Sequence, residues 1–115
     1  MAKKLNYRDR YGNQQPNSYW RIVSINISLI QQEAVILFFG YKDKQAYDSG
    51  AAPLGNKEYV INGASFTAFY NSHLAPGGPN LFQLAYAHAT STKDVVTDPA
   101  DATKNVSFFA NGEDV

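Results

Sequence analysis

The stretch over residues 20–41 constrains the fold most. It begins with a segment in which apolar and polar residues alternate, continues through a polar turn, and ends with a segment that is apolar on both faces. Over residues 23–29, apolar side chains alternate with Ser24, Asn26 and Ser28. A period of two is what a half-buried β-strand requires. The stretch is therefore predicted to form a β-hairpin that is buried in a larger sheet.

The returning strand is predicted over residues 34–41, after a turn at residues 31–33. One face would carry Val35, Leu37, Phe39 and Tyr41, and the other Ala34, Ile36, Phe38 and Gly40. A strand with two apolar faces is normally covered on both sides. We therefore expect this strand to be central in its sheet, or its second face to be covered by the N-terminal segment or by a neighbour.

The remaining elements follow from turn residues and helical spacing. Residues 42–56 read as a projecting loop and residues 57–61 as a strand. Asn62 and Asn80 are placed to cap two helices, which a proline- and glycine-rich breaker separates. Residues 106–110 read as a short final strand. The predicted fold is α+β: a small antiparallel β-sheet with a two-helix layer on one face, in the order β-β-β-α-α-β, with an extended N-terminal arm.

Length and composition set the expected domain organisation. The chain has 115 residues, of which 44% are hydrophobic and 17% charged, so its body is expected to fold around a core. The longest apolar run is far shorter than the ~20 residues that span a bilayer, so no membrane partner is expected. Residues 1–18 are polar and show neither the helical nor the strand period. We therefore predict an extended arm over residues 1–18 and a single α+β domain over residues 19–115.

The formal net charge is zero, but the charges are distributed unevenly. Residues 1–11 carry four cations against one carboxylate, and residues 98–115 carry four carboxylates against one cation. A neutral body with oppositely charged ends does little to repel its own copies. This distribution favours self-association over binding to a polyanion.

The residue types needed for catalysis or metal binding do not cluster in the sequence. The chain has no cysteine, which excludes disulfides, thiolate metal sites and thiol nucleophiles. His73 and His88 would approach each other if two helices pack antiparallel. However, a metal site needs at least three ligands, and no carboxylate lies three or four residues from either histidine. We therefore predict no enzyme activity, no cofactor, and no catalytic or metal site.

The predicted arm interleaves cations with aromatic residues. This composition suits a nucleic acid, by stacking and phosphate contacts, or a protein interface, where tyrosine and arginine are enriched. The rest of the chain offers no second basic patch, which favours the protein interface. The candidate interface residues are Tyr7, Arg8, Arg10, Tyr11 and Tyr19.

Several segments resemble those of small virion-associated proteins of tailed bacteriophages and prophages. They are LNYRDRYGN at residues 5–13, NSYWRI at 17–22, GNKEY at 55–59, QLAY at 83–86 and GEDV at 112–115. The resemblance covers most of the chain, and none of its motifs carries chemistry. It implies a virion component of the tail or baseplate region, made in the bacterial cytoplasm and assembled in several copies with other virion proteins.

A second interpretation stays open, in which the chain is a monomeric accessory protein that binds a host protein or a glycan through the loop at residues 42–56. Amphipathic aromatic residues around the domain can also line a groove for a sugar or a peptide; they are Tyr41, Tyr47, Tyr59, Tyr70 and Tyr86. The carboxylates of this region are interleaved with lysines, which argues against hydrolysis of a glycosidic bond. In this alternative the chain binds its ligand and does not cleave it.

Overall fold

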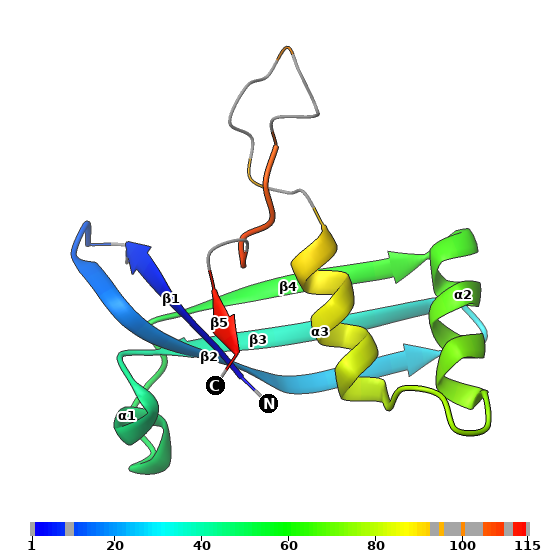
Figure 1. Ribbon diagram of the computed structural model, residues 1–115, viewed down its shortest axis with the longest axis horizontal. Coiled ribbons are helices and arrows are strands. Elements are labelled where there is room, and N and C mark those ends of the chain that lie inside the picture. Colours follow the sequence, from blue (N-terminus) through cyan, green and yellow to red (C-terminus); the bar gives the residue numbers. More distant parts are fainter. Residues whose placement is uncertain are drawn as a thin grey trace.

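The structure is a computed structural model that describes residues 2–8, 11–92, 95, 100, 105–109 and 112–114. Its elements are, in chain order, β1 (Lys3–Arg8), β2 (Gln14–Ser28), β3 (Glu33–Tyr41), α1 (Lys44–Asp48), β4 (Gly55–Asn62), α2 (Gly63–Leu74), α3 (Leu81–Ser91) and β5 (Glu113–Asp114). The predicted α+β class is confirmed (Figure 1). The predicted order of elements is incomplete, because it lacks β1, the short helix α1 and β5.

The five strands form one sheet in the order β4-β3-β2-β1-β5, and all of their pairings are antiparallel. The predicted hairpin is confirmed as β2 and β3, which pair from Tyr19 opposite Tyr41 to Ser28 opposite Glu33. β3 lies between β2 and β4, so its predicted central position is also confirmed.

One face of the sheet carries the core. Trp20, Ile36 and Phe38 are fully buried on this face, and Phe66 and Phe69 of α2 pack into the same cluster. α3 crosses the face from β4 to β2 (Figure 1), and Tyr86 of this helix contacts the ring of Phe38 at 5.4 Å between ring centres. Aromatic contacts at this distance and nearly perpendicular angle add to the stabilisation from burial.

The expectation of an extended arm over residues 1–18 is wrong for the described part of that segment. Residues 3–8 form β1, residues 14–18 belong to β2, and Leu5 is in the core. The hydroxyl of Ser18 donates to the carbonyl of Leu5 at 2.6 Å and accepts from the indole Nε1 of Trp20 at 3.0 Å. The first bond joins β2 to β1 and the second lies within β2, so the segment is part of the folded sheet.

Trp20 also fixes the identity of the residue opposite it. The indole lies so close over Gly40 that a Cβ there would fall 2.4 Å from the ring. Real Cβ atoms do not approach other atoms this closely, so only glycine fits under the indole. Since Gly40 is the partner of Trp20 in the register, the tryptophan uses the space that the missing side chain leaves.

The predicted helix starts at Asn62 and Asn80 are confirmed as N-cap positions of α2 and α3. Asn80 forms a complete capping box with Gln83, whereas Asn62 makes no side-chain capping bond. The final strand predicted over residues 106–110 is wrong over its described residues, because Val106 forms only an isolated bridge with Val95 and a turn follows. Among the described residues, no helix has the length and hydropathy needed to cross a membrane.

Candidate interaction surface

The second half of β2 has one open edge. β1 pairs with β2 only as far as Trp20, which lies opposite Lys3. Within the described ranges, no strand pairs with this edge of β2 from Arg21 to Ser28. An unpaired edge presents backbone donors and acceptors to any chain that can add a strand.

A bulge lies at the beginning of the open half. The pairing with β3 shifts from Ile22 opposite Phe38 to Ser24 opposite Leu37, so Val23 is the extra residue. The extra residue changes which side chains face the core: Ile22 is buried, Ile25 and Ile27 pack against the core, and Val23 is exposed. The simple alternation expected over residues 23–29 is therefore wrong at Val23.

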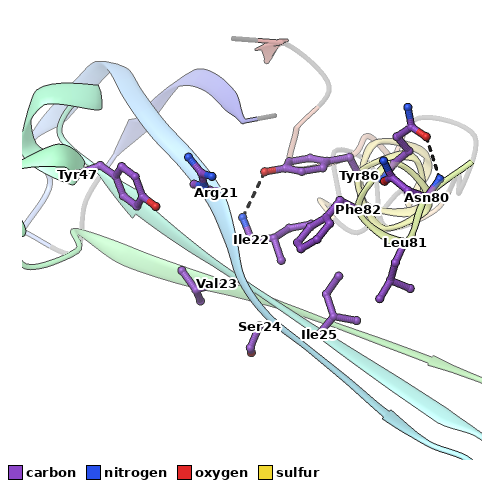
Figure 2. Close-up of a pocket in the computed structure, with 11 residues that line it drawn as sticks. Arg21, Ile22, Val23, Ser24, Ile25, Tyr47, Asn80, Leu81, Phe82 and Tyr86 are labelled. Carbon is purple, nitrogen blue, oxygen red and sulfur yellow. Dashed lines mark hydrogen bonds between the residues drawn. The ribbon is translucent and has the colours of Figure 1, made fainter.

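A groove of about 910 Å³ follows the open edge at the bulge. Residues 21–25 of β2 form one side, Tyr47 of α1 lies at one end, and the first turns of α3 lie at the other, including Phe82 and Tyr86 (Figure 2). Seven of the eleven lining residues are apolar or aromatic, and the other four are Arg21, Ser24 and the two amides of the α3 cap. Such a lining suits an apolar segment of a protein better than a charged small molecule.

The hydroxyl of Tyr86 occupies one backbone amide of the open edge, that of Ile22. It accepts from the backbone amide of Ile22 at 3.3 Å (Figure 2), and burial raises the pKa of this tyrosine. The amide of Ile22 therefore points away from β3 and already has a partner. Strand addition along this edge would begin after the bulge, at Ser24.

Arg21 is held at the wall of the groove by tyrosines. Its guanidinium carbon lies 5.0 Å from the ring centre of Tyr47, the distance of a cation–π contact. A hydrogen bond with Tyr19 raises the pKa of Arg21, which keeps it charged. Tyr47 in turn packs on Tyr19 and Tyr41, with ring centres 5.6 and 5.2 Å away. The contacts of Tyr47 therefore hold α1, and with it the 42–56 segment, against the sheet. The same side chain supplies one wall of the groove.

The tip of the β2–β3 hairpin projects two apolar side chains at the other end of the open edge. Leu29 is 60% exposed and Ile30 is 98% exposed. The amide of Gln31 donates to the hydroxyl of Ser28 at 3.3 Å, and Gln32 has a positive φ of 52°. The turn is therefore built from polar contacts, and the two apolar side chains take no part in the core.

The opposite edge of the sheet, on β4, is different. β4 carries Lys57 and Glu58, whereas no charged residue occurs from Ile22 to Gln32. Charged side chains are a usual means of preventing an edge strand from pairing with another chain. The edge of β4 and the open half of β2 thus differ in their protection, and β2 is the less protected of the two.

The residues predicted to form an interface in the N-terminal segment are dispersed by the fold. Tyr7 packs on Trp20 at 5.0 Å between ring centres, and Tyr19 is buried against Tyr47, so both contact their own chain. Arg8 and Tyr11 are exposed. Arg10 lies outside the described residues. Arg8, Arg10 and Tyr11 stay predictions.

The two histidines do not meet. The chain descends α2 and returns along α3 (Figure 1), so His73 and His88, both in a last turn, lie at opposite ends of the helix pair. His73 is exposed, and His88 lies edge-on to Tyr59 at 6.0 Å between ring centres. In the part of the chain that the structure describes, no three His, Cys, Asp or Glu residues are grouped to hold a metal ion.

Sequence reasoning missed the position of the groove and the hairpin tip, although it named Tyr47 and Tyr86 among the residues that can line a groove for a sugar or a peptide. One signal was present in the sequence: an uncharged run of eleven residues, 22–32, that extends through a turn. Turns are usually polar, so an apolar pair within one indicates a contact surface. Comparisons with protein-family models, with curated proteins and with solved structures find no match.

Proposed function

We propose that this chain is a non-enzymatic structural component of a tailed bacteriophage particle, which assembles in several copies through protein–protein contacts. The resemblance of its segments to small tail or baseplate proteins supports the setting, namely synthesis in the bacterial cytoplasm and incorporation into the virion. The observation that carries the mode of action is the edge of β2 from Ile22 to Ser28, which is uncharged and has no strand partner among the described residues.

An edge strand that is left open can pair with an unwanted chain. An edge strand with unpaired backbone groups and no charged side chain is a template for pairing with another chain. A protein that works alone is expected to block this edge, as Lys57 and Glu58 do on β4. A protein that works in an assembly can leave the edge open, because a neighbouring subunit covers it. Arg8 and Tyr11 would then contribute at the rim of a second contact.

The alternative function is that of a monomeric accessory protein that binds a host protein or a glycan. One observation favours it: Tyr47 of the 42–56 segment lines the groove together with Arg21, Asn80 and Gln83. Aromatic rings and amides are side chains that sugars contact well. In this alternative the groove holds a ligand, and the open edge stays unpaired.

Fractionation of particles separates the two functions. The host carrying the phage or prophage is induced, particles are purified by density centrifugation and treated with nuclease and high salt, and the chain is detected with an antibody. The proposed function predicts a constant ratio of the chain to the major tail proteins in the particle band. Recovery of the chain only in the unassembled fraction would overturn the virion assignment.

A further inference from the structure

Two features of β2 remain unexplained by the fold of a single copy. One is the hairpin tip, where Leu29 and Ile30 project into solvent. The other is the groove beside residues 21–25, walled by Tyr47 and Phe82. Exposed apolar side chains and an open apolar groove each indicate contact with another surface. The tip and the groove lie at opposite ends of the same open edge.

We infer that two copies of this chain pair antiparallel through the open edge of β2, so that the hairpin tip of each copy fills the groove of the other. The inference rests on the proposed function of assembly through protein contacts, and it deepens that function by naming the partner and the surface. A second copy is the fitting partner because one chain supplies both a projection and a matching recess.

The register of this pairing follows from the sequence of the edge. Residues directly opposite each other in an antiparallel pair lie on the same face. A two-fold axis at Asn26 sets Ser24 opposite Ser28, and Ile25 opposite Ile27 of the second copy. The isoleucines then extend the core face of both copies, and the serines and Asn26 lie together on the other face. The edge is thus complementary to itself, as a two-fold contact requires.

The same register places the hairpin tip. When the pairing is continued by two residues beyond Ser28, Leu29 of one copy lies opposite Val23 of the other, and Ile30 lies opposite Ile22. Ile22 and Val23 line the groove. Tyr47 and Phe82 would then cover the two apolar side chains. The amide of Ile22 is occupied by Tyr86, so backbone pairing is limited to Ser24–Ser28. The side chains of the tip supply the contact beyond that limit.

Charge does not oppose this association. The edge from Ile22 to Gln32 has no charged residue, and the chain has a formal net charge of zero. Two copies can therefore pair from Ile22 onward without repulsion between charged side chains, and Arg21 at the wall of the groove is already in contact with the ring of Tyr47. Pairing through β4 would instead bring Lys57 and Glu58 into the contact. The β2 edge is the better of the two for self-pairing.

A single cysteine tests the register. Opposite residues in antiparallel strands have Cα atoms about 4.5–5.5 Å apart, within the range of about 4.4–6.8 Å that a disulfide spans. The chain has no native cysteine, so Asn26→Cys on the two-fold axis should form an intermolecular disulfide readily in mild oxidant. Val60→Cys, on β4, is the matched control. Cross-linking at position 26 no faster than at position 60 would overturn the register.

The hairpin tip is tested by charge. Ile30→Lys alters a side chain that is 98% exposed, so the variant should keep the melting temperature of its monomer. In sedimentation equilibrium its dissociation constant should rise at least tenfold. Val60→Lys, at a position 47% exposed on the other edge strand, should leave the dissociation constant within about twofold. A monomeric native chain at all concentrations, or loss of the dimer with Val60→Lys alone, would overturn the inference.

Together with particle fractionation, these outcomes separate the inference from the proposed function. Incorporation of both the native chain and Ile30→Lys into particles, with no dimer in solution, would remove the inference and leave the proposed function. A β2-edge dimer that never enters a particle would remove the virion assignment and leave the inference.

Discussion

Within β2, the residues up to Trp20 and the residues after it have different neighbours. Residues 14–20 pair with β1, Tyr19 and Trp20 also pair with β3, and Ser18 and Trp20 are buried. Within the described part of the chain, residues 21–28 pair with β3 alone, and Val23 and Asn26 are exposed. The first half looks polar in the sequence and the second half looks like a typical strand. Burial here is decided by which strands are adjacent, and local hydrophobicity alone does not decide it.

The largest expected effect concerns the closed half. Trp20→Ala removes a fully buried indole that contacts Tyr7 and the aromatic residues at 108 and 109, and should cost about 3–5 kcal/mol of unfolding free energy. Val23→Ala, in the open half, should cost less than about 1 kcal/mol, because the side chain is already exposed. Urea denaturation measures both. Equal costs would break the distinction between the two halves.

A pair of serines provides a sharper comparison with a smaller effect. Ser18→Ala removes the acceptor of the Trp20 indole and the donor to Leu5, and should cost about 1–3 kcal/mol. Ser24→Ala, the same substitution in the open half of the same strand, should stay within about 0.5 kcal/mol. If Ser18→Ala proves as mild as Ser24→Ala, the bonds between β1 and β2 are not what fixes the N-terminal segment.

The smallest expected effect concerns α3, the helix that covers the core. Burial lowers the pKa of His88, so the unfolded chain binds this proton better than the folded chain does. Stability from the neutral histidine is therefore fully present above the ordinary histidine pKa of about 6.5 and is lost as the pH falls through and below it.

Thermal denaturation between pH 8 and pH 5.5 measures the effect of His88. The melting temperature of the native chain should fall with decreasing pH, and the fall should be smaller in His88→Gln. His73→Gln, at an exposed histidine of the other helix, should follow the native chain. A native-like decline in His88→Gln would mean that His88 is not buried as described.

The central part of the fold could be predicted because its signals are local. The alternation in residues 23–29, the apolar run of β3 and the Asn80 cap each depend on a few neighbouring residues, and β2, β3 and α3 follow from them. β1 and the first half of β2 could not be predicted in this way. They are stabilised by pairing with each other across the sheet, β3 reaches only Tyr19 and Trp20, and Pro16 lies where the register between β1 and β2 shifts.

The interaction surface could be predicted only in part. The composition of the N-terminal segment indicated contact residues, but Tyr7 and Tyr19 turned out to pack on Trp20 and Tyr47 of their own chain. The groove depends on the bulge at Val23 and on the crossing of α3, and neither has a local sequence signal. The uncharged run over residues 22–32 was the available signal, and it becomes informative once the edge is known to be open.

Amide hydrogen exchange at several protein concentrations tests the central claim, that the second half of β2 is completed by another copy. Between low and high micromolar concentration, exchange at residues 14–20 should stay equally slow, because β1 already covers them. Exchange at Ser24–Ser28 should slow as the concentration rises in the native chain and should not change in Ile30→Lys. Exchange at Ser24–Ser28 that is independent of concentration in the native chain would contradict the account.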